Sequence, residues 1–217
     1  MKWHPYGRNA ILVEFAEKAD DWALHKRCAV TDLLSNKPPP QLLEFVPGFT
    51  TVLLEFDLST GQDLSTLADE VIHLLQSGAR KKIPLGPLKE IPVKYGGPDL
   101  ARVATHNGIT PEKVIHFHST PVYKVQLLGF SPGFPYLGEL HHKLHTPRLD
   151  SPRLKIFAGS VAIGGRHTGI YTVDSPGGWN IIGHTEIKIF DLERAIVGVE
   201  EDAFFLQQGD QVKFVPV

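Results

Sequence analysis

A serine between two glycines is the first place in this sequence where residue types and spacing could do chemistry. The run Gly129-Phe130-Ser131-Pro132-Gly133 satisfies the G-x-S-x-G pattern in which many hydrolases hold a nucleophilic serine. In that turn the residue after the serine donates its backbone N–H to the oxyanion, and Pro132 has no N–H to donate. The pattern therefore predicts a rigid, shaped loop, in which Phe130, Phe134 and Tyr136 either close a core or form an exposed rim.

Glycine is concentrated in the same half of the chain. Ten of the twenty glycines lie between Gly129 and Gly183, and ordering them costs conformational entropy unless special dihedrals or a close backbone approach require them. Segments 164–169 and 175–178 offer backbone N–H groups that could form an anion-binding nest. The sequence has no Walker A and no G-x-G-x-x-G motif, so a nucleotide would bind in an unconventional way. These segments predict a binding function in the second half.

Histidines in two segments could act as bases or as ligands. His116 and His118 share one side of the chain if this segment is extended, and His118 is then either a buried, hydrogen-bonded histidine or a general base. His141 and His145, with His142 between them, have the spacing of two metal ligands on one helical face. That segment is rich in glycine and proline and does not have the glutamate of a zinc protease, so we expect no metal site.

Two arginines repeat within one loop. The unit Pro-Arg-Leu occurs at 147–149 and again at 152–154. Arg148 and Arg153, held by the neighbouring prolines, could clamp a carboxylate or a phosphate. They could equally pair with Asp150, Asp174 or the backbone and simply hold the loop together.

The first 77 residues predict a small α+β domain of the ferredoxin-like kind. Apolar runs at 10–13, 42–46 and 51–56 predict strands, and segments 20–35 and 64–77 predict helices, in the order βαββα. The second helical segment has its apolar residues on one face, after a candidate cap at Asp63. This order favours a sheet with both helices on one side.

A change of composition separates this domain from the rest. Segment 78–92 contains a basic run and three prolines within nine residues, which predicts a linker with a boundary near residue 88 and domains 1–88 and 89–217. Helices are expected to begin near Asp99 and near Thr110, where a proline follows the capping threonine. The strands expected for a barrel or sandwich are 91–95, 122–128, 159–163, 169–173, 181–182, 186–190 and 211–215.

Composition limits the class of protein and of partner. The chain has 217 residues, 42% of them apolar, with 22 basic and 24 acidic residues and a net charge of −2. Because no stripe is dense in Lys and Arg, no nucleic acid partner is expected. The sequence has no signal peptide and no apolar run long enough to cross a membrane, and Cys28 is its only cysteine. We therefore expect a cytoplasmic protein without membrane attachment, in which Cys28 fills an apolar helix face.

Several motifs, taken together and in order, resemble a known family. From about residue 8 to the C-terminus they resemble the family of 5-oxoprolinase B subunits, also called allophanate hydrolase subunit 1, which includes the sporulation-kinase inhibitor KipI. The matching segments are 46–49, 95–100, 129–130, 132–138, 147–148, 152–153, 159–163, 168–171, 175–179 and 182–183.

The resemblance implies a fold, a reaction and partners. It implies a small N-terminal α/β domain followed by a mainly-β, cyclophilin-like barrel. The partners would be a cyclophilin-like C subunit and a lactam-opening A subunit, with ATP and Mg²⁺ as co-substrate. Together they would convert 5-oxoproline, ATP and water to glutamate, ADP and phosphate. Two alternatives remain open: inhibition of a histidine kinase by docking, and carboxyl transfer on urea-like substrates.

Site roles are expected on the same basis. His118 would be an acid/base group, and Arg148 and Arg153 would clamp an anion, so that Arg153→Ala removes activity and leaves the fold intact. His184 stands where the family usually has arginine, so anion binding there would depend on pH. Contacts to substrate or phosphate are expected from Ser160, Arg166, Thr168, Ser175, Gly177, Gly178 and His184. The surface facing the partner is expected at Phe130, Phe134, Tyr136 and Trp179.

Overall fold

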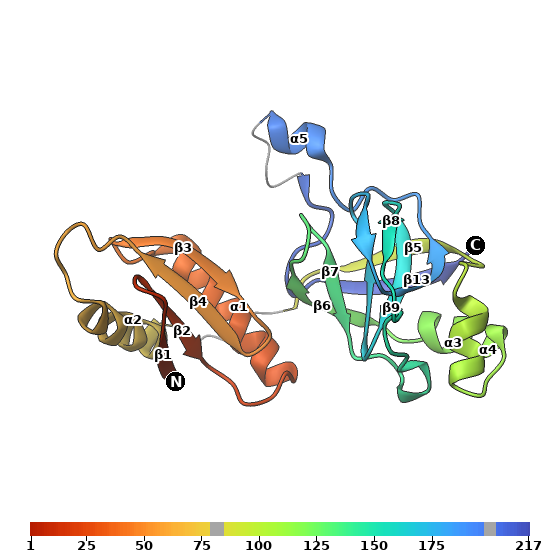
Figure 1. Ribbon diagram of the computed structural model, residues 1–217, viewed down its shortest axis with the longest axis horizontal. Coiled ribbons are helices and arrows are strands. Elements are labelled where there is room, and N and C mark those ends of the chain that lie inside the picture. The colour runs from red at the N-terminus through yellow and green to blue at the C-terminus, as the bar shows by residue number, and fades with distance from the viewer. Residues whose placement is uncertain (79–84, 198–202) are drawn as a thin grey trace. The chain divides into compact units, whose positions relative to one another are not determined.

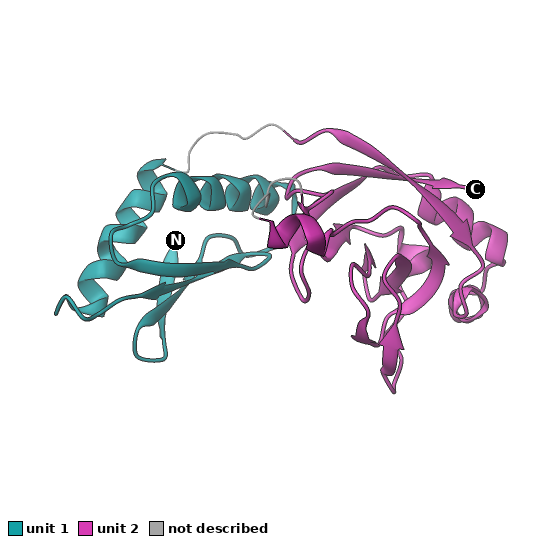
Figure 2. Cartoon of the chain, turned by 90° about the horizontal axis from the view of Figure 1, so that it is seen from above, with its two compact units in different colours: residues 1–84 teal, residues 85–217 magenta. Residues whose placement is uncertain are grey.

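Two separate hydrophobic cores divide the chain into two units in the computed structural model, which describes residues 1–78, 85–197 and 203–217 (Figure 1). The units are Met1–Pro84 and Leu85–Val217, drawn in teal and magenta in Figure 2. Residues 79–84 of the predicted linker lie outside the described residues, and residue 88, the predicted boundary, is the first residue of strand β5.

The N-terminal unit is an antiparallel sheet with two helices on one face (Figure 2). Its strands pair in the order β1-β2-β4-β3. Val13 of β2 and Leu54 of β4 are fully buried, and they pack in one core with Val30 of α1 and Val71 of α2. The elements are β1 (Lys2–Tyr6), β2 (Ala10–Glu14), α1 (Asp21–Asn36), β3 (Leu42–Pro47), β4 (Thr51–Phe56) and α2 (Leu64–Gly78).

The predicted order βαββα is wrong by one strand, because the unit begins ββ. Strand β1 was not predicted, since Pro5 interrupts it and four of its five residues are exposed, so it has no apolar alternation. Helix α1 begins where the sequence indicates, after Asp20, whose carboxylate accepts the Ala23 N–H at 2.9 Å. The ferredoxin-like assignment of this unit stays a prediction.

The C-terminal unit is built on a closed barrel, which confirms the predicted mainly-β architecture. Its strands pair in the order β10-β7-β6-β13-β5-β12-β9, and β9 pairs back to β10. Ile91, Val125, Ile163 and Phe214, from four of these strands, are fully buried in one core. The strands are β5 (Leu88–Tyr95), β6 (Tyr123–Leu128), β7 (Pro135–Gly138), β9 (Ser160–Gly164), β10 (His167–Ile170), β12 (Asn180–His184) and β13 (Gln211–Pro216).

Short elements surround the barrel. Helix α4 begins at Pro111, and its cap Thr110 accepts the Lys113 N–H at 3.4 Å, which confirms the predicted start. Strands β8 and β11 form a two-stranded sheet of their own beside the barrel. The elements are α3 (Leu100–His106), α4 (Pro111–Ser119), the 3₁₀ helix η1 (His142–Leu144), β8 (Arg153–Ile156), β11 (Ser175–Gly177) and α5 (Leu192–Ile196).

The strand predictions fail where strands are short or carry proline and glycine. Strands β7, β8 and β11 were not predicted; two of them contain both proline and glycine, and all three are at most four residues long. Segment 186–190 is not a strand, although Phe190 makes an isolated bridge to Phe204. The segment of His116 and His118 is helical rather than extended, because it belongs to α4.

No helix among the described residues is both long enough and apolar enough to cross a membrane.

Replacing Gly97 by alanine should destabilise the barrel. Gly97 follows β5, and an added Cβ would lie 2.5 Å from the carbonyl oxygen of Ile181. Overpacking of this kind costs about 1–3 kcal/mol, so thermal unfolding should occur several degrees lower. Gly129→Ala is the matched control, because a Cβ there meets nothing within 4 Å. Equal melting temperatures for the two variants would contradict the close approach of the two backbones.

Candidate functional site

A cavity with basic walls opens between the end of β5, strand β8 and the end of β12. Its volume is about 650 Å³. No aspartate or glutamate lines it among the described residues, whereas Lys94, Arg153, Lys155 and His184 do. We call it the basic pocket. It is lined by Lys94, Tyr95, Gly96, Gly97, Pro98, Arg153, Lys155, Ile156, Phe157, Ser160, Ile181, Gly183 and His184.

Arg153 is held in the pocket wall by Asp99. Its guanidinium donates two hydrogen bonds to the Asp99 carboxylate, at 2.9 and 2.8 Å. One carboxylate oxygen also accepts the backbone N–H of Ile181 at 2.7 Å. Asp99 is buried and Arg153 is partly exposed, and the hydrogen bonds that Arg153 donates to the Asp99 carboxylate raise the pKa of Arg153. The pair joins the turn before α3, strand β8 and strand β12.

Asp99 therefore has a different role from the one its position suggests. It precedes α3, as the sequence indicates, but its side chain makes no capping hydrogen bond. Arg153 pairs with neither Asp150 nor Asp174, the two carboxylates considered from the sequence. Because Asp99 balances its charge, Arg153 is only partly available to an anion in the pocket. Asp99 was missed as a site residue, although it lies inside the Tyr95–Leu100 motif.

The remaining cations differ in how far their charge is balanced. Lys155 pairs with Asp174 at 2.9 Å, and both side chains are about half exposed. A backbone hydrogen bond from Ala158 lowers the pKa of the Asp174 carboxyl. His184 lies 3.7 Å from an oxygen of Glu186. Lys94 forms no ion pair with the described residues, so it is the pocket cation with the most charge left for a ligand.

A chain of hydrogen bonds runs from the pocket wall into the core. The Tyr95 hydroxyl lies 2.7 Å from Nδ1 of His118, and Nε2 of His118 lies 2.8 Å from the Thr168 hydroxyl. Thr168 donates its one proton to the carbonyl of Ala162 at 3.0 Å, so it must accept from Nε2 of His118. Nδ1 is then the acceptor, and the Tyr95 hydroxyl donates to it. His118 is neutral in this arrangement and fixes the Tyr95 ring.

The prediction of His118 as an acid/base group is not supported by its surroundings. His118 has no exposed surface, and burial lowers its pKa to about 3. A substrate in the basic pocket would meet Tyr95, whose pKa burial raises, and not the imidazole. The sequence left a buried, hydrogen-bonded histidine open as the alternative, and the structure selects it. Thr168 is likewise buried and does not face the pocket.

The structure does not bring all predicted anion contacts together. Of these residues, Arg153, Ser160 and His184 line the basic pocket. Arg166 follows the far end of β9, where it pairs with Glu139 at 2.8 Å. Because Ser160 and Gly164 are opposite ends of that strand, Arg166 is remote from the pocket.

Arg148 is exposed and lies against an aromatic ring, outside the basic pocket. The Arg148 guanidinium lies 5.9 Å from the centre of the Trp179 ring. Gly177 is in contact with the Tyr171 hydroxyl, which leaves no room for a Cβ. The Ser175 hydroxyl oxygen is buried without a hydrogen-bond partner among the described residues. Gly178 lies beside the Arg148 side chain. None of these four residues, Arg148, Ser175, Gly177 and Gly178, lines the basic pocket.

The aromatic residues predicted as a partner surface divide into buried and exposed ones. Phe134 and Trp179 are buried, with ring centres 5.4 Å apart, and Tyr136 packs against both. Their place in a second core cluster removes Phe134 and Trp179 from any exposed rim. Phe130 alone is strongly exposed. The sequence left open whether this loop closes a core or forms an exposed rim. Phe134 closes a core, and Phe130 is exposed.

The predicted histidine cluster is not arranged for a metal ion. His141 stacks on Phe117 with ring centres 4.4 Å apart, and Nε2 of His145 lies 3.2 Å from the Leu140 carbonyl oxygen. His142 begins the short η1 helix. Within residues 1–78, 85–197 and 203–217 no group of three or more His, Cys, Asp or Glu side chains could hold a metal ion.

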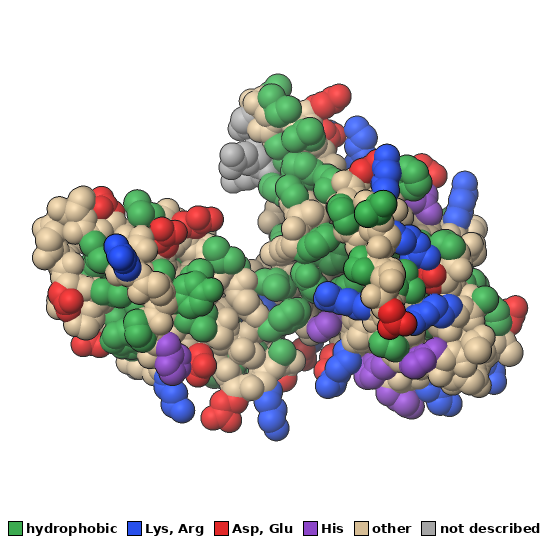
Figure 3. Space-filling view, in the orientation of Figure 1, with side chains coloured by type: hydrophobic (Ala, Val, Ile, Leu, Met, Phe, Trp, Pro, Cys, Tyr) green, Lys and Arg blue, Asp and Glu red, His purple; other side chains and the backbone are tan. Residues whose placement is uncertain are grey.

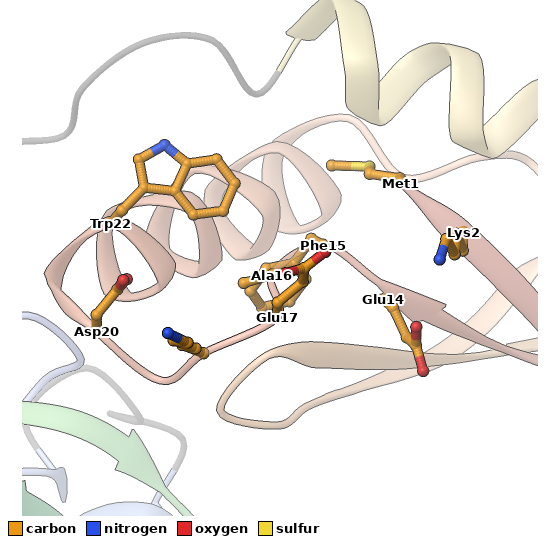
Figure 4. A pocket seen from close by; sticks show the side chains of 9 residues that line it. Met1, Lys2, Glu14, Phe15, Ala16, Glu17, Asp20 and Trp22 are labelled. Atoms are coloured by element: carbon orange, nitrogen blue, oxygen red, sulfur yellow. The ribbon is translucent and has the colours of Figure 1, made fainter.

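A second cavity, of about 590 Å³, lies in the N-terminal unit (Figure 4). Trp22 of α1 stands on one side of it, with Phe15 and Ala16 from the segment after β2. Lys2, Glu14, Glu17, Lys18 and Asp20 also line it. Its charges are of both signs, so it does not select an anion or a cation. We therefore take the basic pocket as the candidate site.

Comparison with known proteins shows related chains. A family model described as carboxyltransferase domain, subdomain C and D, matches residues 1–197. A protein of Escherichia coli O157:H7, named as the B subunit of 5-oxoprolinase, is 43% identical, over 97% of this chain and 93% of its own length. A protein of Bacillus subtilis with the same name is 34% identical, over 97% of this chain and 90% of its own.

Solved structures show the same fold inside longer chains. The crystal structure of TTHA0988 matches with a TM-score of 0.81 and 35% identity, over 96% of this chain and 40% of that chain. This chain therefore spans less than half of TTHA0988. The urea carboxylase of Kluyveromyces lactis matches with a TM-score of 0.76, over 99% of this chain and 21% of that chain; at 21% identity it supports the fold alone.

The buried histidine makes a prediction about pH. Because the folded pKa of His118, about 3, lies below the ordinary value of 6.5, the unfolded chain takes up a proton that the folded chain cannot, so stability falls as pH falls below 6.5. Between pH 7 and pH 5 this loss amounts to about 2 kcal/mol. Urea unfolding should show that His118→Gln loses less stability over this range. His116→Gln, an exposed histidine of the same helix, should behave like the wild type; a His118→Gln curve identical to the wild type would refute the assignment.

Arg153→Ala is now expected to weaken the fold. The substitution leaves the Asp99 carboxylate buried without its counter-ion, which typically costs about 3 kcal/mol or more. The expectation from sequence that the fold stays intact is therefore withdrawn. Arg148→Ala is the control from the same loop, since Arg148 is exposed and contacts the Trp179 ring. If both variants unfold at the same urea concentration, the Asp99 pair does not hold β8 in place.

Proposed function

This chain belongs to the family of carboxyltransferase domains, subdomains C and D, and we propose that it is the B subunit of an ATP-dependent 5-oxoprolinase. The observation that carries the proposal is its identity, over nearly the whole of both chains, to proteins named as B subunits of 5-oxoprolinase. The reaction would convert 5-oxoproline, ATP and water to glutamate, ADP and phosphate. The barrel is proposed to be cyclophilin-like, as the family resemblance implies.

The basic pocket suits a small anion with a flat ring. 5-Oxoproline is such a molecule, with one carboxylate on a planar lactam. The carboxylate would lie near Lys94 and His184, and the ring would lie against Tyr95 and Phe157, all of which line the pocket. Tyr95 is held by His118, so this wall is ordered before a ligand arrives.

The chemistry of lactam opening calls for such a site. A lactam carbonyl resists attack by water because amide resonance stabilises it, and phosphorylation of its oxygen removes that resonance and creates a leaving group. The lactam oxygen attacks the γ-phosphorus and ADP leaves, so the transferred phosphoryl group carries negative charge and more develops on the departing ADP oxygen; fixed cations lower the energy of that transition state. Lys94 and the partly balanced Arg153 would supply this charge.

The described residues do not fit a magnesium ion. Mg²⁺ prefers oxygen ligands, mostly carboxylates, and the basic pocket has no carboxylate lining among the described residues. We therefore propose that this chain contacts anionic groups of the substrate or nucleotide, and that the metal of ATP is held by another subunit. The A and C subunits would complete the enzyme, and the isolated chain would have no turnover.

Carboxyl transfer on urea-like substrates is the second candidate. The description of the matching family and a distant likeness to the urea amidolyase of Lachancea kluyveri, 28% identical over 97% of this chain and 13% of that protein, favour it. It would require a biotin-carrying partner. Turnover that depends on biotin and urea, with none on 5-oxoproline, would select it. Docking to a histidine kinase stays a prediction.

Lys94→Ala tests the proposed site. In the complex reconstituted with A and C subunits, ATP hydrolysis stimulated by 5-oxoproline should fall about tenfold or more, because a charge-assisted hydrogen bond contributes about 1.5–3 kcal/mol. Lys113→Ala, an exposed lysine of α4 outside the pocket, should leave the rate unchanged. Wild-type rates for Lys94→Ala at subsaturating 5-oxoproline would remove the pocket from the mechanism.

A further inference from the structure

Large apolar side chains are exposed at the basic pocket, on α5 and in the loop after β6. In that loop the ring of Phe130 contacts Tyr171, which lines the cavity next to the basic pocket. Phe130, Phe157, Leu192 and Ile196 are 63, 62, 60 and 75% exposed. Phe157 lines the basic pocket, and Leu192 lines a neighbouring cavity of about 550 Å³ that shares His184 with it. Figure 3 shows hydrophobic side chains over α5. We call these four residues the apolar rim.

Phe130 is held outward at an energetic cost. Its backbone has φ +74°, and Phe130 is the one residue other than glycine with positive φ in the described parts of the chain. A bulky side chain in this left-handed region is strained by about 1 kcal/mol or more. Its ring touches Phe134 and Tyr171 only edge-on, with centres 5.5 and 6.3 Å away. Phe130 is therefore both strained and exposed, and its contacts with the described residues of this unit leave its ring mostly in solvent.

Helix α5 exposes its apolar face in the same way. Asp191 caps it by accepting the N–H groups of Glu193 and Arg194 at 3.1 and 3.4 Å. Leu192 and Ile196 are four residues apart and share a face, yet no residue of the helix is buried. A helix of this length is not stable by itself, so it gains most from a surface that covers Leu192 and Ile196.

We propose that the apolar rim is the docking surface for a non-identical protein, which covers the mouth of the basic pocket. Resting on the proposed function, we take this protein to be the C subunit. In TTHA0988 the unit that matches this chain makes up 40% of the polypeptide and is continuous with the other 60%. A unit of this fold thus occurs joined to chain that it does not resemble, which supports a non-identical partner for it where it is a separate chain.

Charge argues against a second copy as the occupant. A symmetric dimer formed through the apolar rim would bring two basic pockets into one interface. Lys94 of both copies would then lie in that interface with no added counter-charge, and like charges brought together in an interface repel each other. The partner is instead expected to present an apolar surface with carboxylates near it. Once covered, the pocket would lose water, which strengthens the attraction between its cations and an anionic substrate.

Phe130→Gly separates docking from folding. Glycine accepts φ +74° without strain, so this variant should unfold at the wild-type temperature or above. Its dissociation constant for the purified C subunit, measured by isothermal titration calorimetry, should rise at least tenfold, and Ile196→Ser should have a similar effect. Val122→Ser, an exposed apolar residue before β6 that lines neither cavity, should bind like the wild type.

The outcomes distinguish the docking surface from the function. Wild-type binding by both rim variants would overturn the proposal, and so would a homodimer of the wild type that the rim variants dissociate in sedimentation analysis. 5-Oxoproline-dependent ATP hydrolysis without affinity between this chain and the C subunit would also overturn it, and would leave the function standing. Rim-dependent binding without such hydrolysis would retain the docking surface and remove the function.

Discussion

The buried carboxylate of Asp99 is the interaction on which the candidate site depends. Its oxygens accept two hydrogen bonds from Arg153 and one from the Ile181 N–H. Taking such charges out of water costs several kcal/mol, which is recovered only when the hydrogen bonds are well formed. Strand β8 belongs to a small sheet with β11 and not to the barrel. This ion pair, together with the buried side chain of Ile156, connects β8 to the barrel and forms part of the pocket wall.

The same balance of charge shapes what the pocket can bind. Asp99 balances Arg153 and Asp174 balances Lys155, so the pocket is not a uniform cluster of free cations. Lys94 forms no ion pair with the described residues and can attract an anion, while Tyr95 and Phe157 offer apolar surface in the same pocket. Phe157 belongs both to the pocket and to the apolar rim. The rim is exposed, and its residue Phe130 is strained, so this surface would gain stability from being covered. Binding of the anion and docking of a partner would therefore reinforce each other.

Sequence patterns predicted the elements whose signal is local. The caps at Asp20 and Thr110 lie where the helices begin, and the apolar runs became the long strands of the sheet and barrel. Strand β1 was not predicted because its apolar alternation is weak, and strands β7, β8 and β11 were not predicted because they are short. Three predicted residues, Arg153, Ser160 and His184, do share one pocket. Asp99 and Tyr95 were missed as site residues. In the sequence Asp99 has the pattern of a helix cap and Tyr95 that of a strand end, and neither pattern distinguishes a structural residue from a site residue.

The sequence by itself determined the features that depend on neighbours along the chain: the exclusion of a nucleophile elbow by Pro132, the helix starts and the mainly-β second half. Only the tertiary structure decided the partner of each charge and the exposure of each ring. Asp99 meets Arg153 across 54 residues and Ile181 across 82, a separation that no local pattern encodes. Closure of the barrel buried His118 and Phe134 and left Phe130 outside, because burial depends on which elements pack together and not on residue type alone.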